Sequence, residues 1–341
     1  MYSFINAGVL SKGYKKFVNS GGGSNPYAGL AAGAWQELSN TKIRDQLPGG
    51  TTGNPTSIVD AYSGACVDTL RHKLIVWGGG HGDYNGNEVY TIDYTSSPSV
   101  SRVFGPTFTT PVSRHTYGGM AYISSTDVMY SVGGATYPDG DKDNTNWEFN
   151  LTSNTFTNRG DSGIGTSILG TWVGYDSVTN QVYINNRNDM LTYNASTYAM
   201  TNRGGSPDPG SLDMSICLDT TRRRMVVITA GSLTYKLLDS PYTNGTISTS
   251  NTPGTVGENC PGFQYDPVGD RFVLWAGGAS VYAVSATGGA WSDITTSGGP
   301  ASAQQAAGTY GRWGYDPTYK VMVLCNSIDE NLFVFKLASG A

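Results

Sequence analysis

Charged residues are scarce in this chain of 341 residues: 21 are Lys or Arg and 26 are Asp or Glu, for a net charge of −5. Ordinary usage would supply about 85 charged residues. An acidic chain with so few cations lacks the basic surface that neutralises phosphates, so we expect no nucleic-acid partner. A helical bundle or coiled coil is excluded because it would be rich in Ala, Glu, Lys and Leu. Disorder is excluded by 39 aromatic residues.

Long apolar runs are also missing. None reaches the roughly 18 residues of a membrane-spanning helix, so we expect no membrane span. In residues 1–17 the positive charges follow the apolar residues, the reverse of a secretory signal, so no signal peptide is visible. The cysteines, Cys66, Cys217, Cys260 and Cys325, do not have the close spacing of a zinc site. In a chain that can build its own core, we expect them to be buried free thiols.

Glycine, by contrast, is abundant, with 46 residues, and it accompanies an internal repeat. A short hydrophobic run recurs six times, at 74–77, 128–130, 181–184, 225–228, 272–275 and 321–324. A segment ending in an aromatic or apolar residue, usually followed by Asp as in Tyr265-Asp266, precedes each run. A third run with strand-like alternation follows it, and most repeats add a weaker fourth.

Four strands in each repeat of about 50 residues predict β-propeller blades, so we expect an all-β, six-bladed propeller over residues 34–341. The last repeat has no room for a fourth strand. The segment around 34–38 resembles the fourth strand at 290–294, yet it precedes the first repeat. We therefore expect this N-terminal strand to complete the last blade and close the ring, which removes an unprotected sheet edge. Residues 1–33 form a predicted N-terminal arm with a Gly-rich linker.

Glycine pairs end the second strand in three repeats: Gly78-Gly79, Gly133-Gly134 and Gly277-Gly278. With Trp147 and Trp291 one strand later, this pattern resembles kelch repeats, the galactose-oxidase-type propeller. The stretch 76–90 followed by 113–117 is similar to uncharacterised bacterial and phage kelch-type propellers. The resemblance implies the fold and says little about an activity. A copper-radical oxidase is not expected, because no His lies near Cys260 in sequence.

Propeller sites gather where the chain enters the first strand of a blade and where the second strand joins the third. Two polar segments fall there, 80–87 and 113–115, and they should be neighbours. These connections lie on one face of the propeller, around the mouth of its central channel. The candidate ligand-binding residues there are Asp60, His81, Asp83, Arg114, His115 and Glu258. His81 and His115, with Asp83 or Asp60, supply nitrogen and oxygen ligands that suit a transition metal. The alternative is that His81 and Asp83 hydrogen-bond within their own turn.

A second candidate metal site is acidic. Asp139, Asp141 and Asp143 alternate as in the first half of a calcium loop. Asn144 and Asn150 stand where an EF-hand needs Gly and Glu, so a solvated acidic turn is the alternative.

Arginines provide a third candidate site. The sequence Thr-Asn-Arg-Gly places Arg159 and Arg203 at the ends of two fourth strands, toward the expected face of Arg114. Three arginines can bind a carboxylate or sugar acid through paired N–H groups; alternatively each caps its own turn. Aromatic residues near these turns can stack on sugars, namely Tyr84, Tyr137, Trp172 and Trp313.

Two function classes remain. The first is a non-enzymatic binding or structural module, such as a virion (phage) or surface protein used for attachment, decoration or glycan recognition. The apolar residues 1–17 either anchor it in a protein partner or larger assembly or fold back on the propeller. The second is a carbohydrate-active or metal-dependent enzyme at the channel mouth. We favour the first, on a virion or extracellular surface, because the sequence shows no convincing catalytic set.

Overall fold

The computed structural model describes residues 25–163, 169–207, 214–229, 231–254 and 260–337. Almost all regular structure in these residues is strand. The helical segments among them are α1 (Ser57–Asp60) and two 3-10 turns, Ile43–Gln46 and Tyr310–Arg312. None of the described helices is long and apolar enough to cross a membrane. The prediction of an all-β fold is confirmed.

Five four-stranded antiparallel sheets follow one another along the chain. The first holds β2 (Gly64–Asp68), β3 (Lys73–Trp77), β4 (Val89–Asp93) and β5 (Ser99–Phe104). The second holds β7 (Met120–Ile123), β8 (Val128–Val132), β11 (Thr145–Asn150) and β12 (Thr155–Asp161). The third holds β13 (Trp172–Asp176), β14 (Gln181–Asn185), β15 (Asp189–Asn194) and β16 (Met200–Gly205). The fourth holds β17 (Ser215–Asp219), β18 (Arg224–Thr229), β19 (Ser232–Leu237) and β20 (Asn244–Ile247). The fifth holds β22 (Gly262–Asp266), β23 (Arg271–Trp275), β24 (Val281–Ser285) and β26 (Ser292–Ile294).

The sixth sheet combines both ends of the described chain. It holds β27 (Trp313–Asp316), β28 (Val321–Leu324), β29 (Leu332–Lys336) and β1 (Trp35–Leu38). In the antiparallel pair of β1 and β29, Trp35 lies opposite Phe335, and their ring centroids are 4.8 Å apart. The indole Nε1 of Trp35 donates to the carbonyl of Ala279 at 3.0 Å. The expectation that residues 34–38 complete the last repeat is therefore confirmed.

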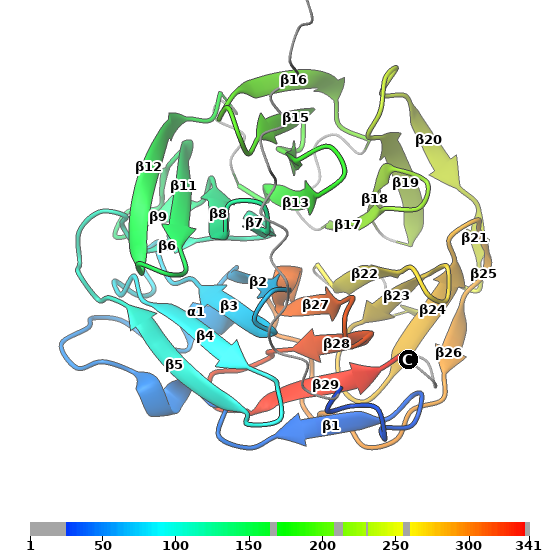
Figure 1. Ribbon diagram of the computed structural model, residues 1–341, viewed down its shortest axis with the longest axis horizontal. Coiled ribbons are helices and arrows are strands. Elements are labelled where there is room, and N and C mark those ends of the chain that lie inside the picture. The colour runs from blue at the N-terminus through cyan, green and yellow to red at the C-terminus, as the bar shows by residue number, and fades with distance from the viewer. Residues whose placement is uncertain (1–24, 164–168, 208–213, 230, 255–259, 338–341) are drawn as a thin grey trace, which may run out of the picture.

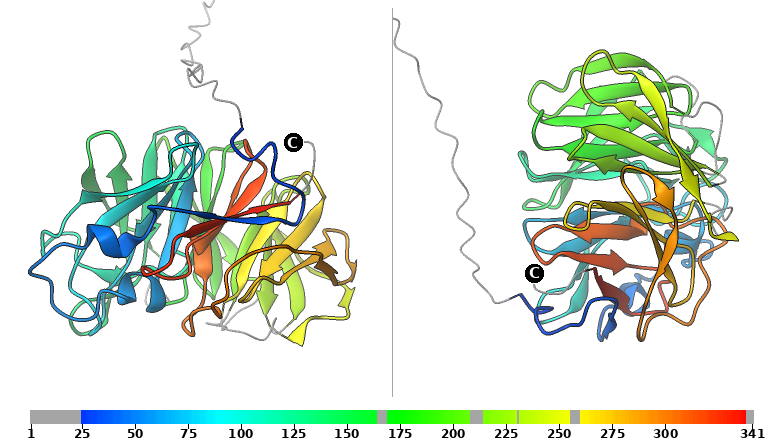
Figure 2. Two further views of the ribbon diagram at one scale, coloured as in Figure 1. Left: turned by 90° about the horizontal axis from the view of Figure 1, so that it is seen from below. Right: turned by 90° about the vertical axis from the view of Figure 1, so that its right-hand side faces the viewer.

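The first strands of the six sheets surround a common axis (Figure 1). β2 contacts β7, and the contacts continue through β13, β17, β22 and β27 back to β2, so the sheets form a closed ring. Figure 2 shows this ring from two sides. Strands this close need residues without side chains: a Cβ on Gly64 would lie 2.0 Å from the Tyr117 carbonyl oxygen, and one on Gly311 2.0 Å from that of Ala65. Part of the glycine surplus is therefore used at the axis.

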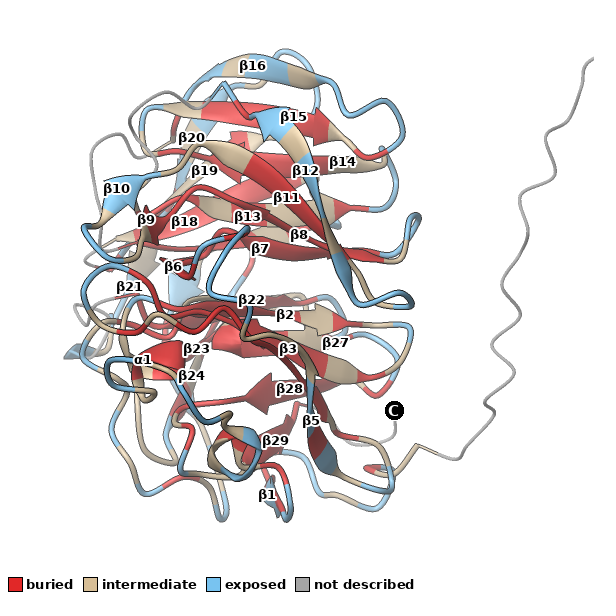
Figure 3. Cartoon of the chain, turned by 90° about the vertical axis from the view of Figure 1, so that its left-hand side faces the viewer, coloured by how far each residue is buried: buried red, intermediate tan, exposed pale blue. Residues whose placement is uncertain are grey.

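Apolar side chains fill the spaces between neighbouring sheets. Val76 and Tyr90 of the first sheet, for example, share a cluster with Val323 and Val334 of the sixth. Because the inner strands bury both of their faces, they read in the sequence as continuous hydrophobic runs. The outer strands β12 and β16 are largely exposed (Figure 3). All four cysteines are buried thiols that form no disulfide, as predicted.

The recurring Asp after the first strand caps the next turn. The Oδ1 atom of Asp68 accepts hydrogen bonds from the backbone N–H groups of Leu70 and Arg71, at 2.9 and 3.0 Å. Asp316 does the same for Thr318 and Tyr319. The repeated Asp is thus explained by turn geometry.

Arginines in two of these turns tie neighbouring sheets together. Arg222 pairs with Asp219 in its own turn and with Asp270 in the turn of the next sheet, where Nη2 and Oδ2 are 2.6 Å apart. The hydrogen bond from Arg222 lowers the pKa of Asp270 from 3.8 to about 2. Arg71 and Asp127 form the equivalent tie between the first two sheets.

Further segments pack on the ring. Residues 25–33, assigned to the arm from sequence, include buried Tyr27, whose hydroxyl donates to the carbonyl of Tyr94. Small sheets are formed by β6 (Arg114–His115), β9 (Ala135–Thr136) and β10 (Asp141–Lys142), and by β21 (Thr249–Ser250) with β25 (Gly289–Ala290). The rest of the predicted arm, residues 1–24, lies outside the described residues.

Candidate functional site

The ring has two distinct ends. At the turn end, the first strand of each sheet turns into the second, as at 69–72 in the first sheet. At the loop end, the second strand connects to the third, as at 78–88, and the chain enters each first strand. Because the strands are antiparallel, these ends lie on opposite sides of the ring. The site predicted from sequence belongs to the loop end.

Three of its residues come together there. Metal-ligating atoms of His81, Asp83 and His115 lie within 4.8 Å of one another. The Nε2 atom of His115 is 2.7 Å from Oδ2 of Asp83, and the two imidazole centroids are 5.6 Å apart. His115 is buried, whereas His81 is exposed. Burial lowers the pKa of His115, and the hydrogen bond with Asp83 offsets this only in part. We call these three residues the His–Asp–His cluster.

Glycines allow this cluster to form. Gly80 has φ +83°, and a Cβ there would lie 2.2 Å from the Cα of Arg114, so only glycine brings the loop of His81 against β6. A Cβ on Gly140 would lie 2.3 Å from Cδ2 of His81. The backbone of Asp83 is held by the N–H of Asn54, which donates to its carbonyl at 2.8 Å.

Arg114 is not accessible to a ligand. Its side chain is 1% exposed, and Nη1 lies 2.8 Å from Oδ2 of Asp143. The guanidinium stands over the rings of Trp77 and Trp147, at 5.2 and 5.9 Å from their centroids. Trp77 belongs to the first sheet and Trp147 to the second, so Arg114 joins two sheets. The sequence could not show this burial, because it depends on β6 folding inward beside both tryptophans.

The structure does not gather Arg159 and Arg203 beside Arg114. Arg159 pairs with Glu148, with Nη2 and Oε2 2.7 Å apart, and lies over the Tyr198 ring. Trp147 and Glu148 are consecutive in β11 and point to opposite faces of the second sheet, so Arg114 and Arg159 lie on opposite faces too. Arg203 bonds Thr192 and lies over Tyr242, in the next interface. The structure therefore does not bring the three arginines together as one anion-binding group.

The acidic candidates also separate. Asp143 forms an ion pair with Arg114, while Asp139 and Asp141 are exposed. Among the described residues, these three carboxylates form no group with metal-ligand spacing. Asp60 ends α1 and lies outside the His–Asp–His cluster. Glu258 falls outside the described residues.

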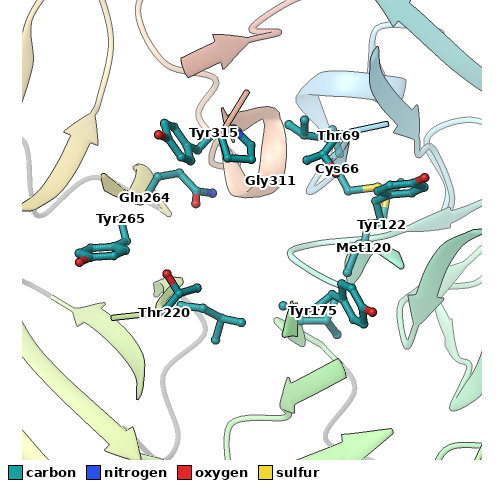
Figure 4. Close-up of a pocket in the computed structure, with 18 of the residues that line it drawn as sticks. Cys66, Thr69, Met120, Tyr122, Tyr175, Thr220, Gln264, Tyr265, Gly311 and Tyr315 are labelled. Carbon is teal, nitrogen blue, oxygen red and sulfur yellow. The ribbon is translucent and has the colours of Figure 1, made fainter. Parts of the chain in front are cut away.

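A cavity runs along the axis, and of the described residues that line it only Trp172 was predicted from sequence to contact a ligand. This axial channel has a volume of about 370 Å³ and is lined by the first strands and the turns that follow them. Residues around it include Thr69, Tyr122, Tyr175, Thr220, Gln264 and Tyr315 (Figure 4). The lining residues Ser124, Ser177 and Thr220 are exposed, so the channel opens at the turn end. None of the described lining residues is charged.

Hydrogen bonding decides which polar groups of the channel are available. The hydroxyl of Tyr122 donates to Asp127 at 3.0 Å, and that of Tyr175 to Asn180 at 2.8 Å. In both cases the acceptor stands five residues later, in the turn. In the sixth sheet, the residue five positions after Tyr315 is Lys320, whose side chain offers no hydrogen-bond acceptor.

One side-chain acceptor points into the channel. Tyr315 lines the channel and is half-buried, but its hydroxyl points away from the axis (Figure 4). Gln264 donates its Nε2 hydrogen to the carbonyl of Trp313 at 3.0 Å, which leaves Oε1 as an acceptor. Figure 4 shows Gln264 pointing into the channel.

The channel had one signal in the sequence. The aromatic or apolar residue before the recurring Asp, or before Ile123 in the second repeat, occupies the same place in every repeat, and a ring of repeats places all six around one axis. Of the aromatic residues predicted to stack on sugars, Trp172 lines the channel, whereas Tyr84 and Trp313 are fully buried.

A closed ring of four-stranded antiparallel sheets around a channel is a β-propeller-type fold, and comparisons support that class. The chain is similar to an auxiliary nutrient binding protein from Bacteroides thetaiotaomicron, with a TM-score of 0.54 at 11% identity over 88% of this chain and 75% of that one. It is also similar to the structure of YjhT, with a TM-score of 0.52 at 10% identity over 83% and 98%. A chain of the mitotic checkpoint complex matches with a TM-score of 0.50 at 10% identity over 86% and 96%. Such identities show the fold alone. No family model and no curated protein sequence matches this chain.

Proposed function

We propose that the protein is a non-enzymatic binding module that takes a neutral, hydroxyl-rich ligand, a glycan segment, into the axial channel. The observation that carries this proposal is the channel itself: about 370 Å³, open to solvent, and without a charged residue among the described residues that line it. Pockets of this size suit small ligands. A charged ligand would lose its hydration there without gaining a counter-charge.

The lining also matches the surface of a sugar. Trp172 and Tyr315 provide aromatic faces on which the C–H groups of a sugar ring can pack. Gln264 offers its Oε1 atom as an acceptor, because its own hydrogen bond uses Nε2. Thr69 and Thr220 add hydroxyl groups near the opening.

The same lining argues against catalysis in the channel. Hydrolysis of a glycoside ordinarily uses a pair of carboxyl groups, one on each side of the bond that breaks. The described lining has none, and burial raises the pKa of two of its other groups, Cys66 and Tyr122, which keeps those two neutral. The alternative, an enzyme at the loop end, keeps the His–Asp–His cluster in the described part of the chain but loses Arg114, which is buried.

In its finer architecture we assign the protein to six-bladed kelch-type propellers. Six four-stranded sheets, one for each repeat, support the blade count, with the two small sheets as additions. Gly79, Gly134 and Gly277 each stand two residues after the second strand, with φ of 115°, 114° and 118°. This shared conformation supports a common kelch-like repeat.

A glycan microarray probed with the labelled full chain tests the binding proposal. Neutral glycans should bind and acidic ones should not. Gln264→Ala should weaken binding, and Thr220→Trp should block the opening. Asp293→Asn, on the exposed outer strand β26, is the control and should bind normally. No binding to any neutral glycan, or binding unchanged in both channel variants, would overturn the proposal.

For an attachment role on a virion or extracellular surface, we propose that residues 1–24 tether the propeller to a protein partner. The apolar residues of this segment and the Gly-rich linker after them support an anchor in a protein partner. Deletion of residues 1–24 should abolish assembly with that partner while glycan binding persists. Assembly that survives the deletion would refute the tether.

A further inference from the structure

The His–Asp–His cluster is not used by the channel, since it lies at the loop end and the channel opens at the turn end. In the described part of the chain it is the one group of three or more His, Cys, Asp or Glu side chains with metal-ligand spacing. Its residues come from the loop between β3 and β4 and from β6, at the junction of the first and second sheets. A bound ion there would join those two sheets.

We infer that His81, Asp83 and His115 bind one divalent transition-metal ion of the zinc type, in a site with three protein ligands. Two imidazole nitrogens and one carboxylate oxygen suit Zn²⁺, Co²⁺, Ni²⁺ or Cu²⁺, whereas Ca²⁺ and Mg²⁺ prefer oxygen ligands alone. Three protein ligands leave a fourth position, and the exposed His81 and the 42% exposed Asp83 direct it to solvent.

Only a small movement brings the ligands into range. In a tetrahedral site, two donors that each stand about 2.1 Å from a zinc ion are about 3.4 Å apart. The present spread is up to 4.8 Å, so closure by about 1.4 Å is enough. Exposed His81 can supply it by rotating its side chain. His115 then carries its proton on Nδ1 and presents the Nε2 lone pair, so the ion replaces its hydrogen bond to Asp83.

The surroundings hold the other two ligands in place. The His115 ring is buried between Tyr62 and Tyr117, with centroids 5.3 and 6.0 Å away. Asp83 is fixed through its backbone by Asn54. Rigid ligands lose little entropy on binding, which favours affinity.

The chain contains its own comparison. His72 has a similar carboxylate partner, with Nδ1 2.7 Å from Oδ2 of Asp316, and it stacks on Tyr319. No second imidazole or further ligand completes a group there among the described residues, and the pair is buried. The His72–Asp316 pair is thus a buried pair with a structural role. His81 is exposed, so a structural role of that kind does not account for its place in the cluster.

Isothermal titration of the EDTA-treated, tag-free full chain with ZnCl₂ tests the site, with Co²⁺ absorption as a second readout. The wild type should bind one ion and show the visible bands of Co²⁺ with nitrogen ligands. His81→Ala and Asp83→Asn should each weaken binding by at least about tenfold, while Asp293→Asn retains it. His81 is exposed, so its variant should keep the wild-type melting temperature.

Two results would overturn the inference. One is the absence of stoichiometric Zn²⁺ binding by the wild type. The other is binding that His81→Ala and Asp83→Asn leave unchanged, which would place the ion elsewhere. Glycan binding by the same preparations reports on the channel separately, so failure of one site is distinguishable from failure of the other.

Discussion

Replacement of Arg114 by Met should destabilise the fold without affecting the binding of a ligand in the channel. The change removes a hydrogen-bonded ion pair with Asp143 and the cation contacts with Trp77 and Trp147. A hydrogen bond to a charged group contributes about 1.5–3 kcal/mol, and a cation over an aromatic ring contributes about 0.5–2 kcal/mol.

Two effects offset part of this loss. Met leaves no buried charge to desolvate, and Nη2 of Arg114 has no hydrogen-bond partner. The Asp143 side chain is 21% exposed, so water takes over part of the contact. A net destabilisation of about 2–4 kcal/mol remains. For this chain length the unfolding entropy is about 0.7 kcal/mol per degree, so the melting temperature should fall by about 3–6 °C.

Differential scanning calorimetry measures the shift, and Arg203→Met provides the matched control. Arg203 also lies between two sheets, over Tyr242, but its partner is the neutral Thr192. Its variant should lose less than about 1 kcal/mol. A shift for Arg114→Met below about 1 °C, or one equal to that of Arg203→Met, would refute the structural role of the buried cation.

Three further predictions concern single sites. Gly80→Ala should destabilise the fold by at least about 2 kcal/mol in urea unfolding and should abolish Zn²⁺ binding, because the new Cβ meets the backbone of Arg114; unchanged stability would contradict this. The pKa of Asp270, lowered by Arg222 from 3.8 to about 2, means that this pair stabilises the fold above about pH 4. Its contribution should fade as the pH falls from about 4 to 2, and Asp270→Asn should flatten that part of a stability-against-pH curve; an identical curve would contradict the pair. Gln264→Ala should weaken neutral-glycan binding about threefold to tenfold in a titration, because it removes the acceptor that points into the channel, and full affinity would remove this side chain from the site.

The repeat allowed much of the architecture to be predicted. Runs such as 272–275 become second strands, and the segment around 34–38 becomes the strand that completes the last sheet. Both predictions rest on local patterns that recur, and recurrence averages out the errors of any single segment. The meeting of His81 with His115 was also predictable, since consecutive repeats place those two loops side by side.

The chemistry of individual side chains was less predictable. Arg114 and Arg159 look alike in sequence, and only the opposite faces of β11 separate them into different interfaces. A channel was expected from the propeller, but its lining was not predicted as a binding site because those residues carry no motif of their own. Gln264 becomes a site residue only through its place at the axis, and that place is set by all six sheets at once.

The pairing of β1 with β29 has a consequence for how the chain reaches its native state. Asn331 donates to Glu37, 294 residues earlier, so this sheet joins the beginning of the ring to its end. During synthesis β1 leaves the ribosome before β29. Trp35 therefore has no strand partner until β29 has been made. Closure of so long a loop is slow, and until it occurs β29 presents an open edge on which a second chain can pair. Folding at high concentration therefore invites exchange of β1 between chains, and such dimers would be the expected by-product of rapid refolding.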